Sequence, residues 1–448
     1  MFLTKNKAFF YLKNNYYILN TENGALIKLD KNSYEHLKNK NIKKLSNEEV
    51  NILRKNGFII DKNEYNNFYF NNRNNYLISK HLKSDSLKID IAVTNKCNFS
   101  CTYCFEKENL NNYINVNEKT KNEFRKNLSD YINNKIKNNN LKKITIVWYG
   151  GEPTLEYDFI NKINKEYYEL GKEKDIEFNN IIISNGYLIN DKFISELKKY
   201  NTSYIQITLD GEKDMHNHRR KLKSNKGTYN QILNNIEKLI SNKIETVIRI
   251  NIDKENFKQV NNLIDTINKK FSKFVGKYLF IDLSRVFGSE YSYTNYEFKD
   301  IKNNFTHKLF KYKFLEPIIS NNGVNAFCSA ECDNDDLVID IFGNVYKCWN
   351  YVYEKDKAYT TLKEIIDNDF KIISRNKNRL DYVEKASLLT VNEGECLSCE
   401  FLRYCKGLCP DQRKRMIEGY EENIYKNDKC KEIVYSYIES NIKEILSY

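Results

Sequence analysis

Short apolar runs alternate with amphipathic segments between residues 87 and 320, and this alternation constrains the fold most. Six strand–helix units in series predict a parallel sheet whose strands are connected by crossover helices. The strand candidates are Lys88–Thr94, Ile144–Tyr149, Asn180–Ser184, Tyr204–Leu209, Thr246–Asn251 and Tyr278–Leu283. The helix candidates between them include Glu118–Ile136, Glu156–Leu170, Ile194–Tyr200, Tyr229–Ile240 and Asn256–Phe271.

Three cysteines, Cys97, Cys101 and Cys104, follow the first strand candidate with gaps of three and two residues. This spacing can bring three thiolates to one side of a loop, and soft sulfur ligands suit an iron–sulfur cluster. A four-iron cluster with three protein ligands has one iron open to chemistry. The alternative is a zinc site, which normally has a fourth Cys or His nearby. The only local candidate, His81, precedes the strand and is poorly placed to close such a site.

The spacing C-x3-C-x2-C, with Tyr103 before the last cysteine, resembles the signature of radical S-adenosylmethionine (SAM) enzymes. In that family the open iron binds SAM, which is cleaved by one electron to give a 5′-deoxyadenosyl radical. The resemblance implies a [4Fe–4S] cluster on the three cysteines and places Tyr103 among the SAM contacts. It also implies that residues 87–320 form a partial (β/α)6 barrel, with the active groups at the C-terminal ends of the strands.

Two turns after later strand candidates extend the resemblance. Gly150-Gly151-Glu152 follows the second strand, where glycines allow close backbone approach to a ligand and Glu152 can accept hydrogen bonds from an ammonium group. It resembles the family's GGE motif, which holds the amino group of SAM. Ser184-Asn185 follows the third strand and resembles the turn near the SAM ribose, although a plain strand–helix turn is an alternative.

The fourth strand is followed by Asp210-Gly211 and then by a His/Arg-rich segment that ends in Arg219-Arg220. By the family pattern Arg220 pairs with the SAM carboxylate, where a planar bidentate donor fits best. Because Arg219 is adjacent, the sequence does not decide which of the two arginines has this role. His216 and His218 are interpreted as structural or substrate-lining residues, and Asn251 and Arg285 as residues that line the pocket or merely its rim.

The other eight cysteines all lie in residues 321–448. From Cys332 they follow C-x10-G-x4-C and then C-x2-C-x5-C-x3-C with one distant cysteine, which resembles the SPASM domain with two auxiliary [4Fe–4S] clusters. The resemblance assigns Cys328, Cys332, Cys348 and Cys409 to the first cluster, and Cys396, Cys399, Cys405 and Cys430 to the second. Two structural zinc sites are the alternative. The sequence does not decide the role of Cys328. It either ligates the first auxiliary cluster or leaves one iron of that cluster free to bind a substrate thiolate.

Residues 1–80 begin with strand candidates Ala8–Leu12, Tyr16–Leu19 and Ala25–Leu29, followed by two short helices. Ser46 with acidic residues behind it predicts the start of the second helix. This winged-helix-like α+β pattern resembles the element that recognises leader peptides in ribosomally made, modified peptide pathways. Such an element adds the leader as a strand at a sheet edge. Residues 61–86 are polar and are predicted to form a linker.

The chain has a net charge of +12, and no apolar stretch is long enough to span a membrane. We therefore expect a cytoplasmic location. No compact basic block suggests nucleic acid as a partner. The leading hypothesis is therefore a peptide maturase that binds a precursor peptide by its leader and installs a thioether cross-link from cysteine. An electron donor such as flavodoxin or ferredoxin is implied, and the catalytic base is not identified.

Alternative reactions use the same parts. A C–C or C–O cross-link and epimerisation are possible outcomes of the same radical chemistry. An anaerobic sulfatase maturase, which makes formylglycine, shares the two C-terminal clusters. That family carries an aspartate directly after the cysteine of the G-x4-C element, whereas Trp349 follows Cys348 in this chain. A non-catalytic electron-transfer or zinc-stabilised binding protein would not need Gly150–Glu152 or Arg220.

Overall fold

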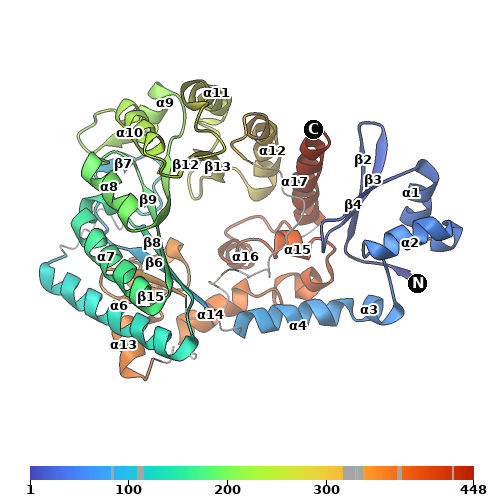
Figure 1. The fold of residues 1–448 in the computed structure, drawn as a ribbon, viewed down its shortest axis with the longest axis horizontal. Helices are drawn as coiled ribbons and strands as arrows, with labels where there is room; N and C mark the ends of the chain where they lie inside the picture. The colour runs from blue at the N-terminus through green and yellow to red at the C-terminus, as the bar shows by residue number, and fades with distance from the viewer. Residues whose placement is uncertain are drawn as a thin grey trace.

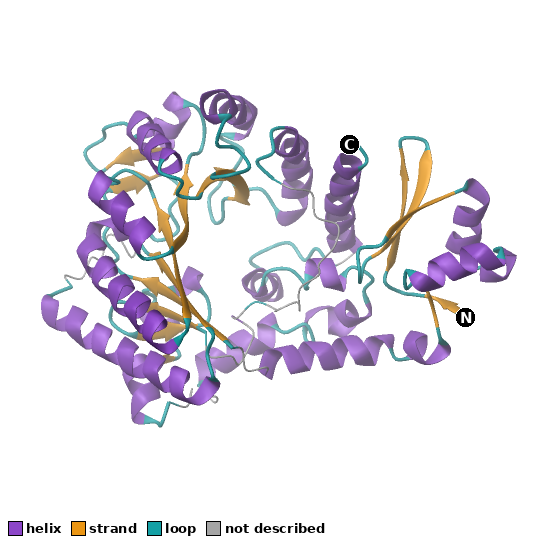
Figure 2. Ribbon diagram, in the orientation of Figure 1, coloured by secondary structure: helices purple, strands orange, loops and turns teal. Residues whose placement is uncertain are grey.

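The computed structural model describes residues 1–81, 85–107, 116–315, 328, 330, 336–370, 376–425 and 428–447. A sheet-and-helix body, a helical C-terminal part and a small N-terminal module follow one another across the molecule (Figure 1). Strands are concentrated in the body and in the N-terminal module (Figure 2). Among the described residues, no helix combines the length and apolarity that a bilayer span requires.

Six parallel strands form one side of a nine-stranded sheet of order β13-β12-β10-β9-β8-β6-β14-β15-β16. The six are β6 (Ser86–Ala92), β8 (Lys143–Tyr149), β9 (Glu177–Ser184), β10 (Thr202–Thr208), β12 (Thr246–Ile252) and β13 (Leu279–Arg285). The helices of the body are α6 (Glu118–Asn139), α7 (Tyr157–Lys174), α8 (Asp191–Lys199), α9 (Lys213–Arg219), α10 (Tyr229–Ser241), α11 (Val260–Phe271) and α12 (Asn295–Lys311). The predicted strands and crossover helices are confirmed, and the six parallel strands form a partial α/β barrel.

Burial alternates along the barrel strands and separates two faces of the sheet. In β12 and β13 every second residue is buried, and the residues between are half-buried. The buried set is mostly apolar and packs under the helices, as Ile248, Ile250 and Ile281 do, with Thr246 and Arg285 as its polar members. The other face carries polar groups such as Arg249, Asn251 and Asp282. This pattern gives a concave polar face that ends at the loops after each strand.

Three further strands extend the barrel sheet beyond β6. β14 (Leu337–Asp340) pairs parallel with β6, and β15 (Asn344–Tyr346) and β16 (Thr360–Thr361) continue antiparallel. β14 and β15 form a hairpin whose turn contains Gly343 at φ +84°. Its pairing with β6 places Cys348, just after β15, next to the barrel.

The remaining C-terminal elements are helical and connect to both other parts. They are α13 (Leu362–Asp367), α14 (Lys377–Ala386), the 3-10 segment η7 (Val391–Ser398), α15 (Leu402–Cys405), α16 (Pro410–Ile417) and α17 (Lys429–Ile445). α17 packs against α12 of the barrel on one side and against strand β2 (Lys7–Leu12) of the N-terminal module on the other. The C-terminal part therefore separates the module from the barrel (Figure 1).

The N-terminal module is an antiparallel sheet of β2, β3 (Asn15–Asn20) and β4 (Leu26–Leu29), followed by α1 (Lys31–Lys38) and α2 (Asn47–Lys55). β1 (Phe2–Leu3) and β5 (Ile59–Ile60) form a separate pair. Ser46 and Glu49 form a capping box, so the predicted helix start is confirmed. One face of the sheet packs on α1 and α2, and the other packs on α17 through Phe10, Leu19 and Ile438.

The prediction of a linker over residues 61–86 is wrong. The segment forms α3 (Lys62–Asn66) and α4 (Phe68–His81), and only its last residues lead into β6. Asp61 starts α3 with a capping box to Glu64. α4 is held by Tyr76, which is fully buried and accepts a hydrogen bond from the Leu388 N–H at 3.1 Å. Tertiary packing therefore makes a helix of a strongly polar sequence.

Candidate active site at the strand ends

The loop of Cys97, Cys101 and Cys104 follows β6 and is fixed by a short strand pair. β7 (Phe99–Cys101) pairs antiparallel with β11 (Arg220–Leu222), so that Cys101 lies opposite Arg220. The pKa of Cys97 is raised to about 12, first by burial and then by the charges of Glu152, Cys101 and Cys104. The three thiols thus lie within electrostatic range of one another. A metal bound to their thiolates would offset the free-energy cost of deprotonating these buried thiols.

The Gly150-Gly151-Glu152 turn follows β8 and packs directly on the segment before Cys97. Gly150 has φ +111°, and a Cβ there would lie 2.5 Å from the Thr94 carbonyl oxygen. The Gly151 N–H donates to the same carbonyl at 2.9 Å. The close approach explains why glycine is needed at position 150.

Glu152 is almost completely buried, and neighbouring donors surround its carboxylate. Its Oε1 accepts from the Thr154 N–H at 3.0 Å and from the Ser184 hydroxyl at 2.8 Å, and its Oε2 accepts from the Asn185 N–H at 2.7 Å. Burial raises the pKa of Glu152 although these hydrogen bonds lower it. Within the described residues Oε2 has this single donor, so it has capacity for one more.

The structure brings Ser184 and Asn185 to the same place. The Asn185 side chain donates to Asn98 Oδ1 at 2.7 Å, inside the cysteine loop, and accepts from the Tyr187 N–H at 3.0 Å. Asn185 therefore links the end of β9 to the cysteine loop as well as to Glu152. The two turns and the cysteine loop form one connected unit.

The two adjacent arginines have different partners, and this difference indicates which of them could bind the SAM carboxylate. Arg219 is fully buried, and its Nη1 lies 2.8 Å from Asp253 and 2.6 Å from Glu255. The Arg220 Nη1 donates to the Tyr103 hydroxyl at 2.7 Å, while its buried Nε has no hydrogen-bond partner. Among the described residues no carboxylate forms an ion pair with Arg220. Arg220 is therefore the arginine with free capacity for an anionic ligand.

Tyr103 joins the cysteine loop to two barrel strands. Its hydroxyl donates a short hydrogen bond to Asp210, at the end of β10, and accepts one from Asn251 in β12 at 3.1 Å. Asn251 thus belongs to the site, whereas sequence reasoning gave it only as a pocket or rim candidate. Asp210 was noticed only as part of a motif, and its contact across the barrel was not predicted.

Three other candidates have structural partners. The ring of fully buried His216 lies 3.1 Å from the Thr228 hydroxyl and accepts from the Asp210 N–H, and burial holds its pKa well below the usual value. His218 is largely exposed and lies 3.2 Å from Glu255. Arg285 donates to the Tyr293 carbonyl and pairs with Glu421 at 3.1 Å, so it ties β13 to the C-terminal part.

Glu106 is a buried carboxyl group that sequence reasoning missed. It lies two residues after Cys104, and burial raises its pKa to about 7. Its charge in turn raises the pKa of Cys104. In the sequence, only its position two residues after Cys104 indicated that Glu106 could belong to the site.

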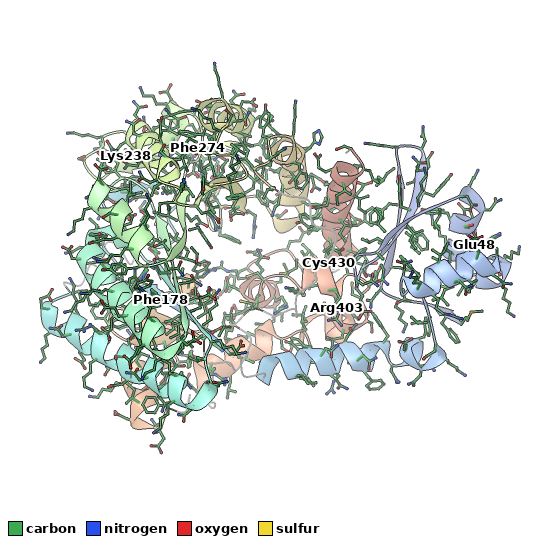
Figure 3. All side chains as sticks on the ribbon, viewed as in Figure 1. Glu48, Phe178, Lys238, Phe274, Arg403 and Cys430 are labelled. Atoms are coloured by element: carbon green, nitrogen blue, oxygen red, sulfur yellow. The ribbon has the colours of Figure 1, made fainter. Side chains whose placement is uncertain are left out.

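The C-terminal cysteines fall into two sets, and Cys332 lies outside the described residues. Burial raises the pKa of Cys348, and the charges of Asp411, Cys409 and Cys328 raise it further. Burial raises the pKa of Cys396 to about 12, with further contributions from Cys405 and Cys430. The pKa of Cys399 is likewise raised to about 12, by burial first and partly by Cys405. Cys430 lies at the start of α17, away from the barrel strand that carries Phe178 (Figure 3).

Within the described ranges, no three His, Cys, Asp or Glu side chains are arranged to hold a single metal ion. A four-iron cluster spreads its thiolates over its corners, whereas zinc needs sulfur ligands about 2.3 Å from one point. A second observation concerns Tyr382, which is buried against Cys348 and whose hydroxyl has no hydrogen-bond partner. This donor and the buried thiols fit a sulfur-rich group, and ligation itself stays a prediction.

Trp349, directly after Cys348, contacts the other site. Its ring packs against Tyr149, at the end of β8, with the centroids 5.6 Å apart. Tyr149 immediately precedes Gly150. Two aromatic rings therefore connect the Cys328–Cys348–Cys409 set to the Gly150-Gly151-Glu152 turn.

Comparisons with known proteins agree with this geometry. Residues 91–267 match the model of the radical SAM superfamily. A cysteine-type anaerobic sulfatase-maturating enzyme of Clostridium novyi is 25% identical over 389 residues, which cover 81% of this chain and 97% of that protein.

Two solved structures share the fold. The structure titled "Native anSMEcpe with bound AdoMet" has a TM-score of 0.59 and 20% identity, and the match covers 81% of this chain and 98% of that chain. Streptococcus suis SuiB bound to the precursor peptide SuiA has a TM-score of 0.50 and 14% identity, over 96% of this chain and 99% of that chain. The motif geometry and the strand topology agree with the match of residues 91–267 to the radical SAM superfamily, and the body of the chain has the partial α/β-barrel fold of that superfamily.

Proposed function

We propose that the chain is a peptide maturase that cleaves SAM and modifies a ribosomally made precursor peptide by a thioether cross-link from cysteine. Arg220 carries this proposal. Among the described residues it forms no ion pair with a carboxylate, and it lies opposite Cys101 and is bonded to Tyr103, while the neighbouring Arg219 is neutralised by carboxylates. An arginine in this position suits the carboxylate of SAM.

The proposed roles of the other residues follow from their positions. Cys97, Cys101 and Cys104 would hold a [4Fe–4S] cluster, which together with SAM would supply the radical that removes a hydrogen atom from the substrate. Glu152 Oε2 would accept a hydrogen bond from the SAM amino group. Tyr103 orients Arg220 through its hydroxyl, and Asn185 holds the turn beside the ribose.

The eight C-terminal cysteines are proposed to hold two auxiliary [4Fe–4S] clusters. Cys328, Cys332, Cys348 and Cys409 form the first set, and Cys396, Cys399, Cys405 and Cys430 form the second. The electrostatic contacts of Cys348 with Cys328 and Cys409, and of Cys396 with Cys405 and Cys430, support this division. The role of these clusters is electron transfer to or from the reacting peptide.

The peptide is proposed to bind through its leader at the N-terminal module. A groove of about 520 Å³ borders strand β2, an edge of its sheet, and is lined partly by α17. Lys7, Phe9 and Tyr435 give it both charge and aromatic surface. An extended leader added at this edge would hold the core peptide at high effective concentration near the barrel. The likeness in fold to SuiB bound to its precursor peptide is consistent with this proposal. We propose a cytoplasmic location.

A second candidate is sulfatase maturation, because the Clostridium novyi relative carries that name. Trp349 argues against it, since no carboxylate follows Cys348, and its ring packs on Tyr149. The N-terminal module is a further feature that formylglycine formation does not explain.

The test begins with anaerobic reconstitution, followed by iron and sulfide counts and by addition of SAM with dithionite. Three clusters predict about twelve irons per chain and formation of 5′-deoxyadenosine. The Cys97→Ala variant should keep about eight irons per chain but form no 5′-deoxyadenosine. Co-expression with a short cysteine-containing peptide encoded beside the gene should then remove two hydrogen atoms from that peptide. Zinc in place of iron, or intact SAM, would refute the proposal, and formylglycine in a sulfatase peptide would support the second candidate.

A further inference from the structure

Residues 399–405 run between two cysteines of the second set, and the N-terminal module packs on this segment. The carbonyl oxygen of Glu400 accepts a hydrogen bond from the hydroxyl of Thr21 in the module at 2.5 Å. The guanidinium of Arg403 lies 3.4 Å from the carboxylate of Glu22, also in the module. The segment that two predicted cluster ligands enclose is therefore a docking surface for the module.

Phe401 connects a sulfur atom of this set to the module. Its N–H donates to Cys399 Sγ at 3.4 Å, and the cysteine loop of the barrel has the same contact two residues after Cys97. Such an N–H suits a thiolate acceptor. The buried Phe401 ring lies 6.5 Å from the Tyr435 ring, which stacks on Phe10 of the module at 4.6 Å between centroids. Two aromatic rings thus join the Cys399 segment to the module.

Another cysteine of the set begins the helix that holds the module. Cys430 is the second residue of α17, and Figure 3 shows it on the side of the C-terminal part that faces the module. Ile438 of α17 packs with Phe10 in one buried apolar group, and Cys399 and Cys405 pack against the same group. Three of the four cysteines of the second set therefore begin or end elements that contact the module.

The groove proposed for the peptide shares this surface. Strand β2 forms one wall of the groove, and residues 400–401 and the first turns of α17 line the rest of it together with α12. Glu400 directly follows Cys399, and Lys431 directly follows Cys430. The groove therefore has its present shape only while β2 is held against the residues next to these cysteines.

The sulfur atoms of the second set come from three separate segments. Cys396 and Cys399 lie in and directly after η7, Cys405 ends α15, and Cys430 lies at the start of α17. A group bound by all of them would tie the three segments together, and its binding free energy would stabilise the part of the fold that holds it. By linkage, docking of the module would in turn favour retention of the group.

We infer that the second cysteine set, when it holds its iron–sulfur group, is the anchor that docks the N-terminal module and thereby assembles the peptide groove. The inference rests on the proposed function, which supplies both the group and the peptide. Without the group, residues 399–405 and the start of α17 are no longer fixed to each other, and the module separates from the C-terminal part. Peptide recognition is thus restricted to chains whose second set is filled.

The experiment measures hydrogen–deuterium exchange of the reconstituted full chain by mass spectrometry. The Cys399→Ala variant should contain about eight irons in place of about twelve. Exchange in β2 and in residues 431–439 of α17 should become at least tenfold faster, while exchange in the barrel strands β8 and β12 stays within about twofold of wild type. Unchanged exchange in β2 of a variant that has lost four irons would overturn the inference.

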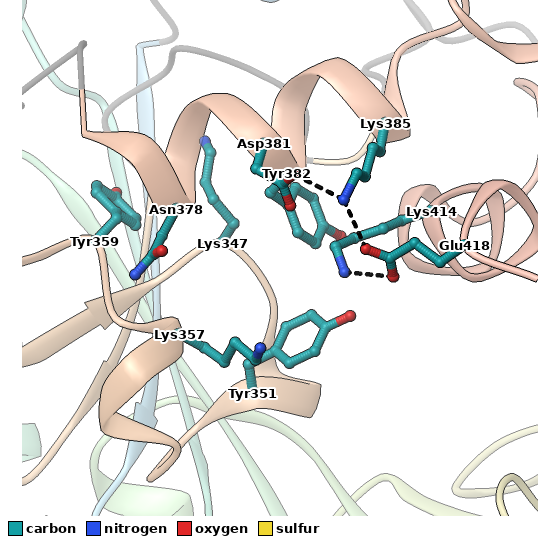
Figure 4. Close-up of a pocket in the computed structure, with 10 residues that line it drawn as sticks. All are labelled: Lys347, Tyr351, Lys357, Tyr359, Asn378, Asp381, Tyr382, Lys385, Lys414 and Glu418. Carbon is teal, nitrogen blue, oxygen red and sulfur yellow. Dashed lines mark hydrogen bonds and ion pairs between the residues drawn. The ribbon is translucent and has the colours of Figure 1, made fainter. Parts of the chain in front are cut away.

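The matched control is Cys348→Ala, which removes a ligand of the first set. Cys348 packs with Tyr351 and Tyr382, and these tyrosines line a cavity of about 270 Å³ between the loop after β15 and the helices α14 and α16 (Figure 4). Within the described part of the chain, no residue of the module belongs to that buried group. This variant should also keep about eight irons, but exchange in β2 should stay within about twofold of wild type. Equal acceleration in both variants would mean that iron loss in general loosens the chain, and it would overturn the inference.

A reciprocal measurement leaves every cysteine in place. Phe10→Ala loosens the module from α17, so an excess of EDTA should extract the irons of the second set at least threefold faster than from wild type. Tyr11→Ala, at a side chain 55% exposed on the same strand, should release iron at the wild-type rate. Equal rates for Phe10→Ala and wild type would overturn the inference.

Formation of 5′-deoxyadenosine with dithionite separates this inference from the proposed function. It depends on SAM and on the cluster of the barrel, whereas exchange in β2 depends on the second set. Absence of SAM cleavage in wild type would refute the proposed function, and the exchange of Cys399→Ala against Cys348→Ala would still decide whether the second set anchors the module.

Discussion

At the scale of single residues, the two adjacent arginines illustrate what the sequence can and cannot specify. The motif suggested Arg220 for the SAM carboxylate, but Arg219 fitted nearly as well by spacing alone. The structure distinguishes them by their partners, because Asp253 and Glu255 neutralise Arg219, while the Arg220 guanidinium donates to the Tyr103 hydroxyl and forms no ion pair with a carboxylate among the described residues. Both carboxylates lie more than thirty residues away in the chain, so no local pattern could reveal the pairing.

Arg220→Lys should weaken SAM binding by about tenfold or more, because an ammonium cannot replace a bidentate guanidinium, and should leave stability nearly unchanged. Arg219→Ala should instead destabilise the fold by about 3–5 kcal/mol, since it leaves two carboxylates without their cation. Calorimetric titration with SAM and urea unfolding of each variant measure the two effects. The assignment fails if Arg219→Ala loses SAM affinity while its stability is unchanged.

Gly150→Ala should destabilise the protein by about 1–3 kcal/mol, because the backbone has φ +111° and the new Cβ would meet the Thr94 carbonyl oxygen. Gly288 is a matched control, since it also has positive φ (+74°) but has no atom within 4 Å of the place that a Cβ would take. Gly288→Ala should therefore cost less, and thermal unfolding of both variants measures the difference. Equal losses would show that left-handed strain, not the close approach, sets the requirement for glycine.

At the scale of elements, the strands of the barrel could be predicted because each is a local apolar run between turns. The predicted Thr246–Asn251, for example, differs from the observed Thr246–Ile252 by one residue. α4 could not be predicted, because Asn72 occupies a buried position between Phe68 and Tyr76 and breaks the apolar periodicity. The pairing of β14 with β6 was also beyond prediction, since it joins residues about 250 apart in the chain.

Tyr76→Ala should destabilise the protein by about 3–5 kcal/mol, because this fully buried ring anchors α4 to the segment around Leu388. Phe70 lies on the same helix but is 58% exposed, so Phe70→Ala should change the free energy of unfolding by less than about 0.5 kcal/mol. Urea denaturation compares the two. Similar losses for both would mean that the helix itself, not its docking, determines the effect.

At the scale of the whole molecule, the N-terminal module and the SAM site are mechanically separate. The module packs on α17 and leads through α3 into α4, and α17 packs on the barrel helix α12. The site at the strand ends is held by contacts within the barrel, such as those of Tyr103 with Asp210 and Asn251. Loss of the module should therefore remove peptide recognition and spare SAM chemistry.

Phe10→Ala tests this separation, because the fully buried Phe10 ring stacks on Tyr435 of α17 with the centroids 4.6 Å apart. The substitution should loosen the module by about 3–5 kcal/mol and increase its cleavage by a protease. Formation of 5′-deoxyadenosine with dithionite, in the absence of peptide, should stay within about twofold of wild type. Tyr11→Ala, on the same strand but at a side chain 55% exposed, is the control and should change neither measurement. A parallel loss of SAM cleavage in Phe10→Ala would show that the module also supports the barrel, and peptide recognition could then not be separated from radical formation.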